Sequence, residues 1–308
     1  MVGVLLNAFA FILIIIIGRI LDAFHVLPAN ASATLKKILI NITLPAAIII
    51  NFNKNTLSSG VTMLALALLG LGANIIMIAV GMIATRKRTS ADKALYMLCL
   101  PSMNIGAFSI PFIQSFLPAA GIVTACMFDV GNSIACTGGT YAFTSQYVTS
   151  DENGIDFRAF IKKLVTSTPL MTYIIMFTIV SLGFHLPHEV ITLINPMAAA
   201  NPFIAMMMIG TMIRIDFKRE YMTDLLAVIG LRHIFSIALA ALCYFVLPLD
   251  LIARQALVII SFAPLSIIAP AYTGLCGGDE GKASAINSLT IILSVIEITA
   301  LLVAMGLN

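Results

Sequence analysis

Residues 91–118 read ADKALYMLCLPSMNIGAFSIPFIQSFLP, a stretch that is apolar enough to cross a membrane and yet contains helix breakers. Pro101 and Pro111 lie inside it, with Asn104 and Gly106 between them. Because proline removes a backbone donor and clashes with the preceding turn, these prolines predict two half-helices joined by an opened segment. Opened backbone is tolerated at membrane depth only where protein encloses it or where it lines a hydrated cavity. We therefore expect an internal site here.

A second interrupted stretch lies in the other half of the chain. Residues 251–277 read LIARQALVIISFAPLSIIAPAYTGLCG, with breakers at Pro264 and Pro270. Paired interrupted segments in the two halves of a membrane protein point to the binding site of a secondary transporter. The sequence therefore predicts one site that is built from both stretches.

The composition is that of a membrane protein. Of the 308 residues, 60% are hydrophobic and 10% are charged, whereas soluble domains have about 45–50% apolar and about 25% charged residues. The five cysteines lack the spacing of a disulfide framework or a zinc site, so we expect free thiols and no metal centre. A net charge of +3 does not favour a nucleic-acid partner. The absence of a phosphate-binding loop and of a nucleophile elbow argues against an enzyme, a cofactor and ATP-driven transport.

Ten apolar runs are long enough for membrane-spanning helices of roughly 20 residues each. They cover residues 3–24, 35–53, 60–85, 91–117, 119–146, 160–184, 189–214, 222–247, 251–277 and 282–307. Five helices per half is an odd number, so a duplicated unit of five must insert its second copy upside down. We expect an all-α membrane protein with a first repeat at 1–148, a linker at 149–159 and a second, inverted repeat at 160–308.

Basic residues near the expected loops favour one orientation. The even-numbered loops hold only Lys54 and Arg254, whereas 14 basic residues lie at the odd-numbered loops. These are Arg19, Lys36, Lys37, Arg86, Lys87, Arg88, Lys93, Arg158, Lys162, Lys163, Arg214, Lys218, Arg219 and Lys282. Because Lys and Arg accumulate on the cytoplasmic side, we expect the odd-numbered loops in the cytoplasm and both termini outside.

Six pieces of the sequence carry a resemblance to a known family. They are LPAAIIINF (44–52), NIGAFSIP (104–111), MFDVGNSIACTGG (127–139), LRHIFSI (231–237), APLSIIAPAYTG (263–274) and ASAINSLTIILS (283–294). Because of the order and spacing of these pieces, the chain resembles the auxin efflux carrier family of secondary transporters, particularly its bacterial members. That family belongs to the superfamily that includes the bile acid sodium symporters. The family usually has a glycine where this chain has Ser109, which implies a stiffer opened segment.

The resemblance implies ten helices in two inverted repeats, with helices four and nine broken and crossing near the middle of the membrane. Helices one, two, six and seven would form a scaffold, often dimeric, against which helices three to five and eight to ten move. Family substrates are small organic anions such as auxin, malate and malonate. We therefore expect a secondary active transporter of a small organic anion in the cytoplasmic (inner) membrane, as a homodimer. The alternatives are a sodium-coupled symporter of the bile acid type and a receptor or passive channel that uses the same pocket.

The candidate substrate site lies at the two breaks. The N-termini of both second half-helices offer unpaired N–H groups and a positive dipole end, which favour a carboxylate. Asn104 matches the family's crossover asparagine and is expected to contact the substrate; the alternative is that it only satisfies opened backbone. Ser266 stands at the mirrored place. The full candidate set is Asn41, Pro101, Asn104, Ile105, Gly106, Pro111, Pro264, Ser266 and Pro270.

The candidate coupling residues are Asp129, Asn132, Arg232 and Glu297. Asp129 and Asn132 lie one turn apart and face the same way, and a carboxylate at membrane depth is a functional candidate. The alternative is an ion pair between Asp129 and Arg232, unless Arg232 extends to the cytoplasmic surface. Glu297 is a second candidate proton carrier, and His233 is expected to make a buried polar contact rather than to bind a metal. A proton, a sodium ion or no coupling ion, the identity of the anion and the direction of transport all stay open.

Overall fold

The computed structural model describes residues 2–54, 60–149, 157–213 and 218–306. Within these ranges the chain is built from helices and contains no strand. Seven helical segments of the described chain are long and apolar enough to cross a membrane. The prediction of an all-α, multi-pass membrane protein is therefore confirmed, although seven is fewer than the ten spans expected.

Each of the seven long segments overlaps one expected span. They are α1 (Val2–Ala23); α2 (Ala31–Ile38), η1 (Leu39–Thr43) and α3 (Leu44–Lys54); α4 (Gly60–Ala84); α7 (Ala119–Ile134), η3 (Ala135–Gly139) and α8 (Thr140–Thr149); α11 (His188–Met212); η4 (Arg219–Tyr221), α12 (Met222–Ala241) and η5 (Leu242–Val246); and α15 (Glu280–Ala304). The expected linker at 149–159 lies largely outside the described residues.

The other three expected spans are divided into shorter helices. They are α5 (Ser90–Cys99), η2 (Ile105–Ser109) and α6 (Ile110–Phe116); α9 (Phe157–Val165) and α10 (Thr168–Ser181); and α13 (Leu251–Ser261) and α14 (Ala269–Leu275). The prolines of the sequence predict the first and third divisions. The second division, between α9 and α10, was not predicted.

Polar caps fix where the two first half-helices begin. Thr89 accepts a hydrogen bond from the N–H of Asp92 at the start of α5, and Asp250 accepts one from the N–H of Ala253 at the start of α13. Such caps satisfy one of the otherwise unpaired donors of a helix N-terminus. Each first half-helix therefore has a defined start and runs to a break.

Helix α11 continues through Pro196 and Pro202. Pro202 leaves the carbonyl of Ala198 without its helical donor, because proline has no N–H. Gln114 Nε2 donates to this carbonyl at 2.9 Å, and Gln114 Oε1 accepts from Asn201 at 2.9 Å. The side chain of α6 thus replaces the missing hydrogen bond of α11 and ties the two helices together.

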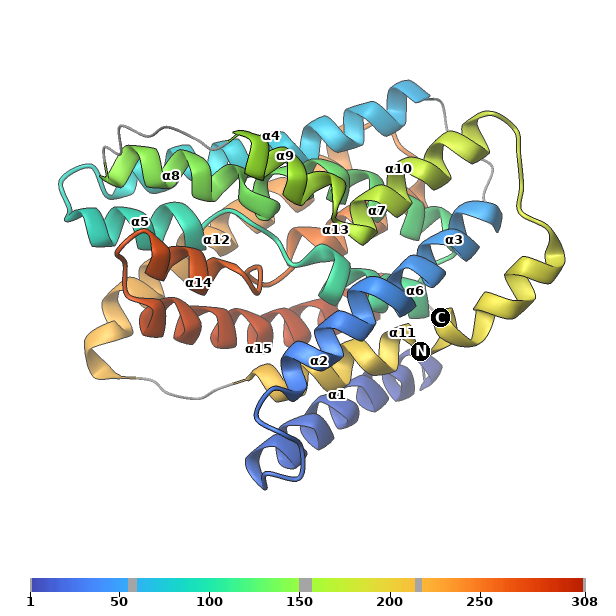
Figure 1. Cartoon of the computed structure of the whole chain (residues 1–308), viewed down its shortest axis with the longest axis horizontal. Helices are drawn as coiled ribbons and strands as arrows, with labels where there is room; N and C mark the ends of the chain where they lie inside the picture. Colours follow the sequence, from blue (N-terminus) through green and yellow to red (C-terminus); the bar gives the residue numbers. More distant parts are fainter. Residues whose placement is uncertain (1, 55–59, 150–156, 214–217, 307–308) are drawn as a thin grey trace.

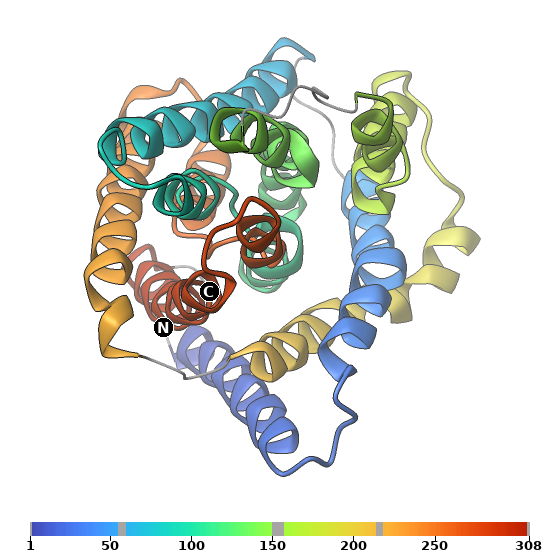
Figure 2. The same cartoon turned by 60° about the vertical axis from the view of Figure 1, so that its left-hand side comes forward.

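The helices that the sequence assigns to a scaffold contact one another in the structure. The expected scaffold helices correspond to α1, α2–α3, α9–α10 and α11, and α11 contacts α1, α2 and α3 while α10 packs on α3. We call these elements the scaffold group and the remaining elements the crossing group. Figure 2 shows the blue and yellow segments of the scaffold group along the right and lower side of the molecule. Contacts between the groups run through α3 and α7, α10 and α7, α11 and α6, and α1 and α15.

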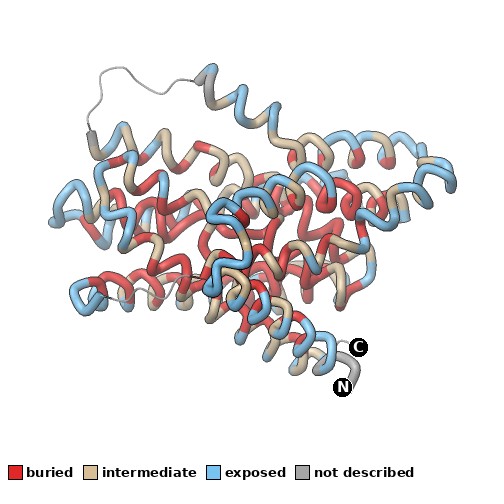
Figure 3. Tube along the Cα trace, turned by 60° about the horizontal axis from the view of Figure 1, so that its bottom comes forward, coloured by how far each residue is buried: buried red, intermediate tan, exposed pale blue. Residues whose placement is uncertain are grey.

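Buried residues lie in the middle of the molecule, and exposed residues line its outside (Figure 3). Many exposed side chains are large and apolar, such as Phe9 of α1, Leu64 of α4 and Ile234 of α12. Exposed apolar surface on this scale is unusual for a soluble monomer. It is the surface expected of helices that face lipid.

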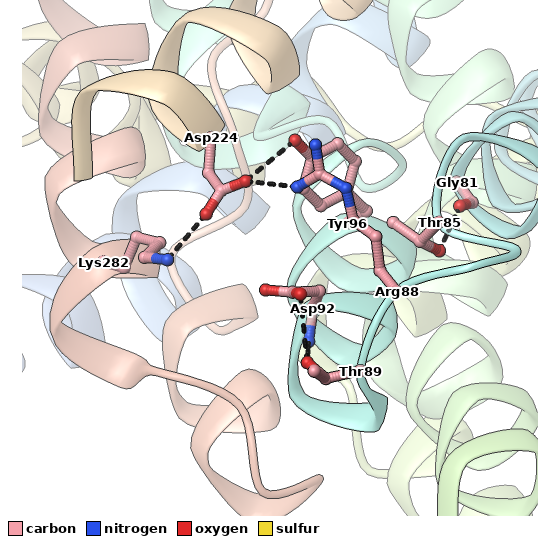
Figure 4. A network of polar contacts seen from close by, with 8 residues as sticks. All are labelled: Gly81, Thr85, Arg88, Thr89, Asp92, Tyr96, Asp224 and Lys282. Atoms are coloured by element: carbon pink, nitrogen blue, oxygen red, sulfur yellow. Dashed lines mark hydrogen bonds and ion pairs between the residues drawn. The ribbon is translucent and has the colours of Figure 1, made fainter. Parts of the chain in front are cut away.

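A charged network ties three elements of the crossing group together at one end (Figure 4). Asp224 of α12 accepts hydrogen bonds from Arg88 at 2.6 Å, from Lys282 of α15 at 2.6 Å and from Tyr96 of α5 at 3.1 Å. The hydrogen bond to the Asp224 carboxylate raises the pKa of the Arg88 guanidinium. The network therefore fixes α5, α12 and α15 relative to one another.

Candidate functional site

The breaks after α5 and after α13 lie against each other near the middle of the molecule (Figure 1). The N–H of Asn104 donates to the carbonyl of Pro264 at 2.9 Å, and the N–H of Ser266 donates to the carbonyl of Ser102 at 2.9 Å. These reciprocal bonds satisfy backbone groups that the helix interruptions leave open. Two segments that are far apart in the sequence thus form one crossing.

Side chains of two neighbouring helices hold the first break. Asn132 of α7 accepts from the N–H of Met103 at 3.1 Å and donates to its carbonyl at 2.8 Å. Asn74 of α4 accepts from the N–H of Ser102 at 2.6 Å and donates to Asn132 at 3.1 Å. Asn132 is therefore a structural support of the crossing as well as a candidate of the sequence analysis, whereas Asn74 was missed.

Fewer side-chain hydrogen bonds hold the second break. The N–H of Leu265 donates to Thr290 Oγ1 of α15 at 3.2 Å. Thr290 was not a candidate, because a single threonine in an apolar helix gives no local signal. The two breaks are thus held in a similar way by unequal side chains.

Arg232 of α12 closes the ends of both first half-helices. Its side chain is buried, and it donates hydrogen bonds to the carbonyl oxygens of Cys99, Leu100, Pro101 and Ala263. The last carbonyls of a helix lack intrahelical partners and form the negative end of its dipole, so a buried cation is stabilised there. Arg232 therefore neither pairs with Asp129 nor extends to the surface, and both readings of the sequence were wrong.

Asp129 is 4% exposed and lies at the boundary between the two groups. Its carboxylate accepts from Asn132 Nδ2 at 2.8 Å and from the hydroxyl of Tyr173 at 3.0 Å. Tyr173 belongs to α10 of the scaffold group, and the sequence analysis did not identify it. No ion pair involves Asp129 in the part of the chain that the structure describes. The carboxylate is thus held by neutral donors, one from each group.

A cavity of about 470 Å³ lies beside the crossing. Six candidates of the sequence analysis line it together: Asn104, Ile105, Gly106, Asp129, Asn132 and Ser266. The side chain of Asn104 makes no hydrogen bond to the described residues, whereas its backbone N–H binds Pro264. Asn104 therefore does not serve to satisfy opened backbone through its side chain, and its amide is available to a ligand.

Two of the four candidate prolines lie at the breaks, and two lie within helices. Pro101 and Pro264 belong to the two breaks, as predicted, but they do not line the cavity. Pro111 and Pro270 lie in the first turns of α6 and α14, where the fixed φ of proline suits a helix. They therefore do not open the backbone, and they do not line the cavity. Ser109 likewise lies in the helical turn η2 rather than in an opened segment.

Two further candidates lie away from the cavity. Asn41 is exposed and accepts a hydrogen bond from Thr168 Oγ1 at 2.7 Å, which joins η1 to the start of α10. Glu297 of α15 makes a short hydrogen bond with His233 Nε2 of α12. Neither Asn41 nor Glu297 lines the cavity beside the crossing. The described residues bring together no group of three His, Cys, Asp or Glu side chains for a metal.

Two lysines of the scaffold group complete the cavity. Lys36 of α2 and Lys163 of α9 line it, together with Thr166, Ser167 and Tyr272. Lys163 and Thr166 are exposed, so the cavity is reached from the end of the molecule at which they lie. In the sequence both lysines indicate only the orientation, because nothing local separates them from other loop cations. The cavity thus combines two cations and the N-termini of η2 and α14 with one carboxylate, that of Asp129, and the excess of positive charge favours a small anion.

No protein-family model matches this chain, and no curated protein matches it. The auxin efflux carrier family therefore stays a resemblance of sequence pieces.

Proposed function

We propose that the chain is a secondary active transporter of a small organic anion in the cytoplasmic membrane. The observation that carries this proposal is the cavity beside the crossing, in which Asn104, two helix N-termini and the cations Lys36 and Lys163 converge. Donors and positive charge of this kind select for a carboxylate over a cation. The cavity volume of about 470 Å³ suits a small organic acid.

The proposed membrane organisation has ten crossings in two inverted repeats, with both termini outside. The divided pairs α5–α6, α9–α10 and α13–α14 would supply the three crossings beyond the seven long helices. The reciprocal bonds between Asn104 and Pro264 and between Ser266 and Ser102 agree with a twofold relation between repeats. With the basic loops in the cytoplasm, the cavity at Lys36 and Lys163 is open to the inside. The proposed homodimer rests on the resemblance alone.

Alternating access would move the crossing group against the scaffold group. Asp129 bridges that boundary through its hydrogen bond with Tyr173. We propose that protonation of Asp129 changes this bond and so couples the movement to a proton, since a neutral carboxyl group accepts more weakly. Glu297 stays the second candidate, and sodium coupling stays the alternative. Arg232, also a coupling candidate, would position the crossing through its hydrogen bonds to backbone carbonyls.

Uptake into proteoliposomes tests the proposal. Labelled malonate, malate and an auxin-like acid should be taken up saturably, and unlabelled acid inside should drive counterflow. A passive channel would show flux without counterflow, and a receptor would bind without flux. Dependence on an imposed sodium gradient would favour the symporter alternative. The variant Asn104→Ala, reconstituted at equal amount, serves as the control for flux through the cavity.

The proposed orientation has its own test. Ser90, the first residue of α5, follows the basic segment between α4 and α5 and is exposed. In a background without native cysteines, Ser90→Cys should resist an impermeant thiol reagent in intact cells and react after permeabilisation. Rapid labelling in intact cells would reverse the orientation without affecting the choice of substrate.

A further inference from the structure

A second cavity, of about 330 Å³, lies between α4 and the α7–η3–α8 segment, which is kinked at Gly138. Leu71, Ile75, Ile78 and Met82 line it from one face of α4, and Phe143 closes it from α8. These α4 residues span roughly 16 Å at 1.5 Å per residue, about the depth of one leaflet in a hydrocarbon core of roughly 30 Å. Ile75 and Phe143 are 57% and 44% exposed, so the cavity opens to the lipid-facing surface.

The cavity ends at a basic segment. Arg86, Lys87 and Arg88 come after Thr85, the first residue beyond α4, and line a separate hollow with Ile83 and Ala84. Arg88 is engaged by Asp224 at 2.6 Å. Arg86 and Lys87 are exposed and form no ion pair within the described ranges of the chain. Two uncompensated cations thus lie just beyond an acyl-sized apolar cavity.

We propose that this cavity holds an acyl chain of an anionic phospholipid whose headgroup binds Arg86 and Lys87. The apolar walls would accept the chain of any lipid, and the charge complementarity at the end of α4 selects an anionic headgroup. Basic groups near helix ends bind anionic headgroups in this way on the cytoplasmic side of membranes. The proposal does not rest on the proposed transport activity, since no residue that lines this cavity also lines the cavity at the crossing.

The lipid would lie against the support of the crossing. Asn74 lines this cavity, and the same side chain accepts from the N–H of Ser102 and donates to Asn132. An acyl chain that fills the space beside Asn74 limits its alternative rotamers and so stabilises the hydrogen bonds of the first break. Occupancy of the lipid site would therefore stabilise the hydrogen bonds that Asn74 makes at the crossing.

Tryptophan fluorescence tests the proposal, because the chain contains no tryptophan. Phe143→Trp places a single reporter in the cavity, and Ile75→Trp places one on the opposite wall. The purified protein in phosphatidylcholine vesicles is titrated with phosphatidylglycerol or phosphatidylcholine that carries bromine on its acyl chains. We expect several-fold stronger association of the brominated anionic lipid at both reporters. The matched control Ile234→Trp, on the exposed face of α12, should show no preference.

Neutralising the headgroup site should remove the preference. In the Phe143→Trp background, Arg86→Gln and Lys87→Gln should each lower the relative association of the anionic lipid about fivefold, since each cation near the surface contributes on that scale. The exchange Arg86→Lys with Lys87→Arg should retain it. If the neutral variants fail to fold, 1 M salt applied to the parent reporter should reduce the preference instead. Equal quenching by both lipids, a preference that survives neutralisation and salt, or equal quenching by a brominated uncharged detergent would overturn the proposal.

Discussion

Arg232 Nη1 lies 2.6 Å from the carbonyl oxygen of Leu100, to which it donates a hydrogen bond at the end of α5. The same guanidinium donates from Nη2 to Ala263 at 3.0 Å, at the end of α13. The planar fork of arginine supplies donors in several directions at once, which an ammonium group does not. One buried side chain thus fixes where both first half-helices stop.

We predict that Arg232→Met destabilises the protein by at least about 3 kcal/mol, because four carbonyls lose their donor and an unpaired buried acceptor costs roughly 1–3 kcal/mol. The thermal midpoint of the detergent-solubilised protein measures this. The thermal midpoint of Arg232→Lys should fall between those of the parent and of Arg232→Met. Arg219 is exposed, so Arg219→Met serves as a control with the same change of charge. A variant Arg232→Met that melts with the parent would show that the four carbonyls need no buried donor.

We predict that Asn104→Ala weakens binding of the substrate by about 1–3 kcal/mol, the cost of leaving a buried polar group without its partner. The amount of folded protein should not change, since the side chain of Asn104 has no hydrogen bond to lose within the described residues. Equilibrium binding of the anion found in the uptake assay measures the effect. Ser115→Ala, which removes a hydroxyl of α6 outside the cavity, should bind as the parent does. Parental affinity of Asn104→Ala would place the substrate elsewhere.

We predict that Asp129→Asn retains exchange of substrate but loses the acceleration of uptake by an imposed pH gradient. Its melting temperature should change little, because no cation is left unpaired when the charge is removed. Tyr173→Phe should weaken the dependence on the gradient without abolishing it, since it removes only the donor from the scaffold group. Unchanged gradient dependence in Asp129→Asn would remove this residue from coupling. Glu297→Gln, tested in parallel, would then show whether the carboxylate of Glu297 couples uptake to the pH gradient instead.

We predict that Cys136 is the native cysteine most reactive toward a small polar thiol reagent. It lines the cavity and is half-buried, whereas Cys99, Cys126, Cys243 and Cys276 are buried. In a chain that retains Cys136 alone, labelling should be slowed by saturating substrate. A chain that retains Cys243 alone provides the control. Labelling of Cys136 that is indifferent to substrate, in protein shown to bind it, would contradict a shared cavity.

The breaks in the helices could be predicted from the sequence because their cause is local. Pro101 and Pro264 each lack a backbone donor and force the chain open where they stand. The prediction that Pro111 and Pro270 open the backbone was wrong, because proline is tolerated in the first turn of a helix. Where that first turn lies depends on the preceding break. Helix α11 tolerates Pro202 for a reason that is not local, because Gln114 of α6 replaces the missing hydrogen bond.

The supports of the site could not be predicted, because they depend on which helices become neighbours. Arg232 binds backbone carbonyls, so a search for a carboxylate partner led to Asp129. Tyr173 and Thr290 each stand alone in an apolar helix, and only the packing brings them to Asp129 and to Leu265. All five cysteines are free, as their spacing predicted.

The reciprocal backbone bonds at the crossing limit how the molecule can change shape. Pulling the two segments apart would leave two donors and two acceptors unpaired, at roughly 1–3 kcal/mol each, whereas conformational states that interconvert in function differ by only a few kcal/mol. The two crossing segments therefore cannot move one after the other. Whatever displacement occurs carries both segments as one rigid piece, so a ligand held by Asn104 would travel with these segments relative to Lys36 and Lys163 of the scaffold group.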